Sequence, residues 1–225
     1  EKAASLLANL VAKVDGNPEL IDAESKVSLY NTLGRTLIIL KREGWRELFV
    51  KSIKLQEIFD PENVVRTQCY FLQGLLRFEL CDAESLLLNM EQSGAKGLSS
   101  DFLVFYRSEI ERRRGGLWDD PQFELECEDR GGHAFGLYLQ ATARQNGRPS
   151  GDVQIRFLRA ASAFEKAAGD GLDLNLLNLF AIFMRLGAAV SARNLVRIEL
   201  ETRSAKEFLN EEGASEVRSF YQKYL

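Results

Sequence analysis

Apolar residues recur along this chain at the spacing of an α-helix almost throughout. Strand-like alternation of apolar and acidic residues occurs once, over residues 123–128. Glycines stand where the periodic segments stop, as helix C-caps do. The pattern therefore predicts an all-α protein. Its expected helices, about eleven, cover residues 2–14, 19–43, 45–59, 62–81, 83–93, 100–114, 133–146, 152–168, 173–187, 190–210 and 214–224.

Prolines indicate where helices begin. Asn17-Pro18, Asp60-Pro61 and Asp120-Pro121 each put a possible capping side chain before a proline. An Asn or Asp side chain can accept a hydrogen bond from a free N–H group, and proline is tolerated in the first helical turn. We expect helix starts at these pairs.

The longest apolar stretch runs from Leu172 to Ala192, but Asp173 and Arg185 are among the polar residues that interrupt it. A membrane-spanning helix needs about 20 predominantly apolar residues. We therefore predict a buried core helix and no membrane span. Arg185 is expected either to reach solvent at the helix edge or, if buried, to face an acidic residue such as Glu165 or Glu199 or a groove, because a buried guanidinium is costly without a partner.

Part of the chain resembles a repeat. Tyr30, Leu33, Gly34 and Leu37, followed by a second helix and Pro61, resemble the start and the terminal proline of a tetratricopeptide repeat. No tryptophan stands at the first position, and Gly74 follows Gly34 by forty residues, where the repeat has about 34. Ala160, Phe164 and Ala167 resemble the second helix of such a repeat.

The resemblance implies stacked antiparallel helical hairpins, with a compact helical bundle as the alternative. It also implies a scaffold or adaptor that binds a peptide or a partner helix in a concave groove. Asn31, Arg35, Gln68, Phe71 and Leu75 are the expected groove residues. Because this set is rather apolar, we expect an amphipathic or apolar partner and not the capture of a C-terminal carboxylate.

Glycine pairs bracket residues 115–132, which contain Pro121 and six acidic residues. We expect a linker or insertion there, between an N-terminal array (1–114) and C-terminal hairpins (133–225). Arg112, Arg113 and Arg114 precede it and suit either a helix C-terminus or an acidic partner. The last helix carries Val217, Phe220, Tyr221, Tyr224 and Leu225, so it is expected to cap the hairpins or contact an oligomer partner or adjoining domain.

Composition narrows the function. The net charge of −4 disfavours nucleic acid as the main partner. One histidine, His133, cannot supply the usual imidazole ligands of catalytic zinc, and no common catalytic or nucleotide-binding motif occurs, so we expect no metal, no cofactor and no enzyme. Cys69, Cys81 and Cys127 are widely spaced, which suggests buried thiols in a reducing, cytoplasmic protein.

Two alternatives remain open at this stage. One is a regulatory or ligand-sensing domain with a pocket between helices, around Phe180, Phe183 and Arg185. The other is an enzyme that uses Asp, Glu and Arg residues in no recognisable motif.

Overall fold

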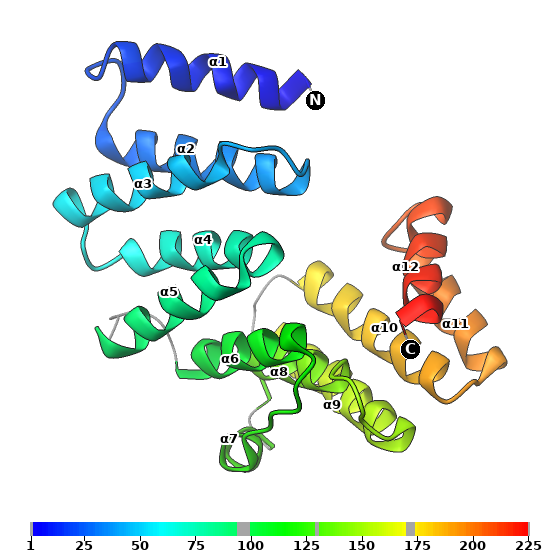
Figure 1. The fold of residues 1–225 in the computed structure, drawn as a ribbon. Coiled ribbons are helices and arrows are strands. Elements are labelled where there is room, and N and C mark those ends of the chain that lie inside the picture. The colour runs from blue at the N-terminus through cyan, green and yellow to red at the C-terminus, as the bar shows by residue number, and fades with distance from the viewer. Residues whose placement is uncertain (1, 94–99, 129–130, 170–173, 225) are drawn as a thin grey trace. The chain divides into compact units, whose positions relative to one another are not determined.

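The computed structural model describes residues 2–93, 100–128, 131–169 and 174–224, and in these residues all regular elements are α-helices (Figure 1). They are α1 (Lys2–Gly16), α2 (Ala23–Ile39), α3 (Trp45–Phe59), α4 (Val64–Phe78), α5 (Leu80–Gln92), α6 (Ser100–Arg114), α7 (Pro121–Cys127), α8 (His133–Ala143), α9 (Ser150–Gly169), α10 (Leu174–Ser191), α11 (Leu195–Lys206) and α12 (Glu211–Tyr224). The all-α prediction is confirmed. The described residues form twelve helices, not eleven.

Helix α7 is the additional helix, and it occupies the segment with strand-like alternation. Asp120 caps it by accepting a hydrogen bond from the Phe123 N–H at 2.9 Å, and Pro121 stands in its first turn, as predicted. A helix brings residues four apart to one face. Phe123 and Cys127 are accordingly buried, whereas Leu125, which a strand would place with them, is 68% exposed.

The other two proline pairs do not begin helices. Helix α2 begins after Asp22, which caps it, and α4 begins at Val64. Pro18 and Pro61 lie in the turns before these helices. The predicted starts were therefore several residues too early, because proline suits a turn as well as a first helical turn.

The chain divides into two compact units, residues 1–99 with α1–α5 and residues 100–225 with α6–α12. We call them unit 1 and unit 2. The boundary between the units lies before the segment 115–132 that was predicted as a linker or insertion, because α6 packs against α8 and α7 lies within unit 2. Asp129, one of the acidic residues of that segment, lies outside the described residues.

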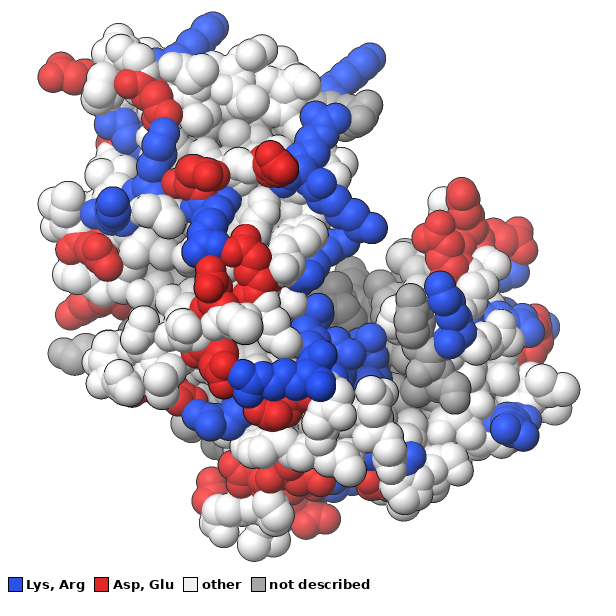
Figure 2. Space-filling view, in the orientation of Figure 1, with Lys and Arg blue, Asp and Glu red and all other residues white. Residues whose placement is uncertain are grey.

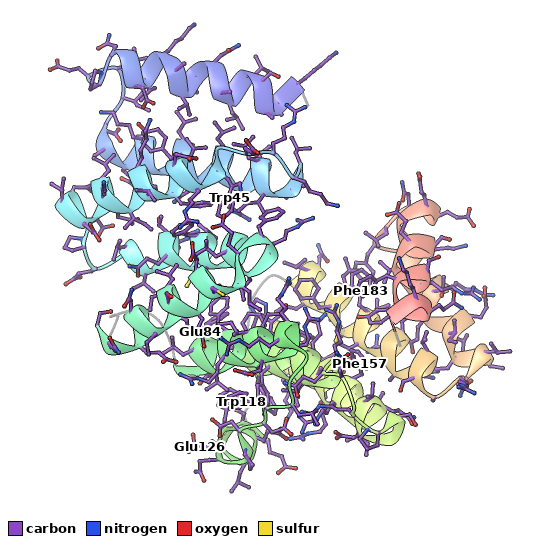
Figure 3. All side chains as sticks on the ribbon, in the orientation of Figure 1. Trp45, Glu84, Trp118, Glu126, Phe157 and Phe183 are labelled. Atoms are coloured by element: carbon purple, nitrogen blue, oxygen red, sulfur yellow. The ribbon has the colours of Figure 1, made fainter. Side chains whose placement is uncertain are left out.

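In unit 1, each helix packs against the next one along the chain, and α2 also contacts α4. Aromatic rings pack between α3 and α4, with Trp45 (Figure 3) at the start of α3. Trp45 lies 6.0 Å from Phe71 and 5.7 Å from Phe78, measured between ring centroids, and Phe49 stacks on Phe71 at 5.8 Å. These contacts hold α4 against α3.

The core of unit 2 lies around α8, α9 and α10. Helix α10 is the core helix predicted from the apolar stretch, since Leu177, Met184 and Leu186 are all at most 2% exposed. No described helix has the length and apolar character needed to cross a bilayer. Helix α12 packs against α10 and α11, with Tyr221 buried 5.7 Å from the ring of Phe157; Leu225 lies outside the described residues.

Both units bring a helical glycine against a buried phenylalanine of the next helix. A Cβ atom added to Gly34 of α2 would lie 2.9 Å from Phe49 of α3, and one added to Gly136 of α8 would lie 2.7 Å from Phe164 of α9. Neither phenylalanine is exposed to solvent. Glycine is therefore required at both positions by the close approach of the two helices.

Replacing Gly136 with alanine should destabilise the protein by about 2 kcal/mol, the cost typical of overpacking a tight core, although alanine favours a helix. The free energy of unfolding in urea, followed by circular dichroism, measures this. Gly151 is the matched control, because no neighbouring atom lies within 4 Å of its added Cβ. Gly151→Ala should leave stability unchanged or slightly raised, and an equal loss in both variants would contradict the packing argument.

Candidate functional site

A groove of about 420 Å³ lies in unit 1 over α2, α3 and α4. We call it the polar groove, because most of its lining side chains carry hydrogen-bonding or charged groups. The lining residues are Glu24, Val27, Ser28, Asn31, Thr32, Arg35, Gln56, Phe59, Asp60, Asn63, Arg66, Thr67 and Tyr70. Its volume lies within the range of small-ligand and peptide pockets.

The floor of the polar groove is a hydrogen-bonded chain across three helices. The Asn31 amide of α2 donates to the Thr67 hydroxyl of α4 at 2.9 Å, and that hydroxyl donates to the Gln56 side-chain carbonyl of α3 at 2.7 Å. Ser52 of α3 donates to the Asn31 side-chain carbonyl at 2.8 Å. Ser52 and Thr67 are at most 1% exposed. Each of these hydrogen bonds compensates a buried polar group for the hydrogen bonds to water that it loses on folding.

Two arginines stand around Tyr70 at one end of the polar groove. The Arg35 guanidinium lies over the Tyr70 ring, 4.6 Å from its centroid, and the Arg66 Nε donates to the Tyr70 hydroxyl at 3.2 Å. Both arginine side chains are exposed. Stacking on a ring holds a guanidinium in place while its N–H donors stay available to an anionic group.

Two carboxylates also line the polar groove. Glu24 lies in the first turn of α2, and Asp60 lies between α3 and α4, where its Oδ1 accepts a hydrogen bond from the Asn63 side chain at 3.0 Å. The bond between Asn31 and Thr67 joins the middle of α2 to the first turn of α4. Glu24 and Arg35 are therefore separated along α2, whereas Asp60 and Arg66 both lie near the start of α4.

The structure brings together two of the five residues predicted for the groove, Asn31 and Arg35. Phe71 and Leu75 do not line it, because they are 9% and 1% exposed and belong to the core. Gln68 is half-buried on α4 and is not part of the lining either. The predicted apolar character of the groove is therefore corrected to a polar one.

Sequence reasoning missed Gln56, Arg66, Thr67 and Tyr70. A signal for Tyr70 was present, because it stands four residues before Gly74 just as Tyr30 stands four before Gly34. No comparable signal marks Gln56, whose partner Thr67 lies on a different helix.

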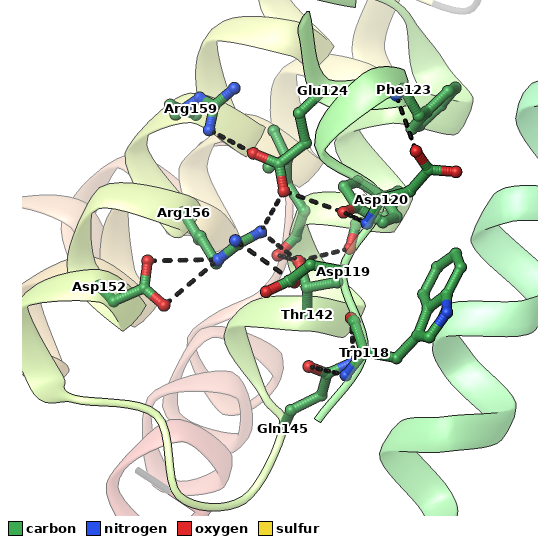
Figure 4. A network of polar contacts seen from close by, with 12 residues as sticks. Trp118, Asp119, Asp120, Phe123, Glu124, Thr142, Gln145, Asp152, Arg156 and Arg159 are labelled. Atoms are coloured by element: carbon green, nitrogen blue, oxygen red, sulfur yellow. Dashed lines mark hydrogen bonds and ion pairs between the residues drawn. The ribbon is translucent and has the colours of Figure 1, made fainter. Parts of the chain in front are cut away.

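A second polar cluster, the charged clasp, lies in unit 2 and binds the segment around α7 to α8 and α9 (Figure 4). Acidic side chains gather over α7 (Figure 2). Glu124 accepts hydrogen bonds from the guanidinium groups of Arg156 and Arg159, both at 2.8 Å, and from the Tyr138 hydroxyl at 2.9 Å. The remaining members of the clasp are Trp118, Asp119, Asp120, Thr142, Gln145, Arg148 and Asp152.

Arg156 is the centre of the clasp and is 8% exposed. It pairs with Glu124, with Asp119 at 3.3 Å and with Asp152 at 3.3 Å, and it donates to the Thr142 hydroxyl at 3.0 Å. Burial raises the pKa of Glu124, but the hydrogen bonds from Arg156 and Arg159 outweigh it and hold that pKa below its usual value. Because the acidic and basic side chains of the clasp form ion pairs with one another, we interpret the clasp as a structural element.

The three arginines at the end of α6, predicted to suit a helix C-terminus or an acidic partner, all form ion pairs within that helix. Arg112 and Arg113 both bind Glu109, at 2.7 and 2.6 Å, and Arg114 binds Glu111 at 3.3 Å. All three stand in the last turn of α6, where positive charge interacts favourably with the negative end of the helix dipole.

Arg185 contacts Glu165, as predicted, and its second partner is Glu201 at 3.1 Å, not Glu199. Phe180 and Phe183, the proposed walls of a ligand pocket, pack against the core of unit 2. These contacts favour a structural role for the three residues.

His133 lies among aromatic rings, about 6 Å from those of Phe102, Phe164 and Phe180. Burial lowers its pKa. Of the cysteines, Cys127 is buried as predicted, whereas Cys81 is exposed and Cys69 is half-buried. Within the described ranges, no three His, Cys, Asp or Glu side chains lie close enough to hold a metal ion.

Comparison with known proteins yields no matching family model, no matching curated protein and no matching solved structure.

Replacing Arg156 with methionine should destabilise the protein by about 3 kcal/mol, because removing one partner of a buried ion pair leaves the other charge uncompensated. Urea unfolding measures the loss. Arg159→Met is the control: this side chain is 33% exposed and makes one bond to Glu124, so its removal should cost less than about 1 kcal/mol. Equal losses in the two variants would mean that Arg156 is not the centre of the clasp.

Acid should weaken the clasp. The pKa of Glu124 is lower in the folded protein than in an unfolded chain, where it is about 4.3, and the pKa of Asp152 is lowered too. Their contribution to stability is thus present above the unfolded pKa and is lost as the pH falls through the folded one. We expect the free energy of unfolding to fall below about pH 5. In Glu124→Gln the free energy of unfolding should fall less steeply with decreasing pH. An unchanged pH dependence would exclude Glu124 as the source of the acid sensitivity.

Proposed function

We propose that this protein is an interaction module that binds an extended segment of a partner protein in the polar groove. The observation that carries the proposal is the groove itself, where exposed Arg35 and Arg66 are held beside Tyr70 above a fully hydrogen-bonded floor. A rigid floor with available donors along its rim suits recognition, because little has to be ordered when the partner binds.

The architecture of unit 1 supports this role. Helices α2 and α4, which follow one another as the first helices of the pairs α2–α3 and α4–α5, contact each other and supply most of the groove lining. This is the arrangement expected of tetratricopeptide-like hairpins, and we propose that the two pairs are degenerate repeats of this kind. The three free cysteines are compatible with a scaffold in the reducing cytoplasm.

The charges of the groove favour a particular class of segment. Arg35 follows Glu24 by eleven residues along α2, a distance of about 16 Å at the helical rise, which an extended peptide covers in about five residues. A segment with a basic residue facing Glu24 and an acidic residue facing Arg35 would pair with both side chains. We therefore expect a charged, extended partner instead of the apolar one inferred from Phe71 and Leu75.

Selection from a random peptide library displayed on phage tests the proposal. We expect enriched peptides to carry a basic and an acidic residue about five positions apart. In the double variant Arg35→Glu, Arg66→Glu these peptides should bind at least about tenfold more weakly, because a charge-assisted hydrogen bond contributes roughly 1.5–3 kcal/mol. Titration calorimetry measures the affinity.

Arg77→Glu is the matched control, because Arg77 is an exposed arginine of α4 that does not line the groove. It should bind the selected peptides as the unaltered protein does. Circular dichroism checks that each variant is folded. Failure to select any peptide, or equal binding by the double variant, would contradict the proposal.

A further inference from the structure

Unit 1 has a second concavity, of about 370 Å³, over the turn between α1 and α2 and the adjoining face of α3. We call it the lysine-rimmed hollow. Its lining residues are Val14, Asp15, Pro18, Lys26, Tyr30, Lys51, Lys54, Leu55 and Ile58. None of them lines the polar groove, so the two sites are separate.

The inner surface of the hollow is apolar. Val14 and Tyr30 are 1% and 6% exposed and form its base, and Leu55 is half-buried beside them. Ile58, at the edge, is 81% exposed. An isoleucine left so fully in water gains about 1.5–3 kcal/mol when another apolar surface covers it. The hollow therefore presents a base and an edge that a bulky apolar side chain can contact together.

The rim of the hollow is positively charged. Its lining contains three lysines but only one carboxylate, Asp15. Asp15 already accepts hydrogen bonds from Lys51 at 2.7 Å and from the Tyr30 hydroxyl at 2.6 Å. Lys26 donates to the Pro18 carbonyl, and the exposed Lys54 makes no polar contact with another described residue. These ammonium groups stand around an apolar base in a chain whose overall charge is −4.

We propose that the lysine-rimmed hollow binds a partner segment in which a bulky apolar side chain is flanked by acidic residues. The apolar side chain enters between Tyr30, Leu55 and Ile58, and the flanking carboxylates pair with the rim lysines. Each part of the surface is then matched, since burial of apolar area provides affinity and opposite charge provides selectivity.

The shape of the site favours a protein segment over a membrane. A bilayer takes up apolar side chains that protrude from a basic surface. A hollow instead receives a side chain from its partner, as the apolar anchors of peptide ligands enter pockets. A second copy of this chain is a weaker match. Its exposed Leu125 and Leu200 each stand between two glutamates, but one glutamate of each pair is already bound by arginines, Glu124 by Arg156 and Arg159 and Glu201 by Arg185 and Arg197.

Methyl NMR of the full chain tests the proposal. The probe is a synthetic peptide with a phenylalanine between two pairs of glutamates, and the control probe has lysines in place of the glutamates. We expect the glutamate peptide to shift the methyl signals of Val14, Leu55 and Ile58, and the lysine peptide to leave them unchanged.

Two variants locate the binding. Lys54→Glu and Ile58→Ser should each weaken binding of the glutamate peptide at least about fivefold, the change in affinity that a loss of about 1 kcal/mol produces. Leu6→Ser removes a comparably exposed apolar side chain of α1, 70% exposed, and should change nothing.

Three results would overturn the proposal. The first is the absence of methyl shifts at high peptide concentration, and the second is an affinity unchanged by Lys54→Glu and Ile58→Ser. The third is binding to vesicles of anionic phospholipid, with the same sensitivity to Lys54→Glu, in place of the peptide; it would assign the hollow to a membrane surface.

Discussion

Polar side chains buried between α2, α3 and α4 have to find hydrogen-bond partners, and this requirement governs how the three helices meet. Ser52, Gln56 and Thr67 are almost completely removed from water, so a shift of one helix along another would leave a donor or an acceptor without a partner. The bonds therefore fix the alignment of the helices. The same alignment places Tyr70 of α4 beside Arg35 of α2 in the polar groove.

How far the sequence predicted the groove can be seen from α4. The repeat resemblance led to Asn31 and Arg35, because they directly follow Tyr30 and Gly34, which the resemblance placed, and both line the groove. It failed for Phe71 and Leu75. Helical spacing shows which residues share a face but not which neighbour that face meets, and here the aromatic contacts with Trp45 and Phe49 turn the apolar face of α4 toward α3.

The charged clasp shows a second limit of sequence reasoning. Glu124 and Arg156 stand 32 residues apart, and nothing in either local sequence indicates the other. The same segment was expected to be a linker or an insertion because glycine pairs bracket it, and a short helix with two buried residues has too little periodicity to be recognised. Ion pairs between this segment and α9 hold the segment in unit 2.

The aromatic contacts of Trp45 and the hydrogen bonds around Trp118 have a spectroscopic consequence. The chain has two tryptophans, and one lies in each unit. Trp45 is 6% exposed among phenylalanines, whereas the backbone of Trp118 is bound by Gln145 within the clasp and its ring meets Tyr138 edge-on. Replacing either indole with phenylalanine leaves a single tryptophan, so its selectively excited emission reports on the environment and unfolding of its own unit.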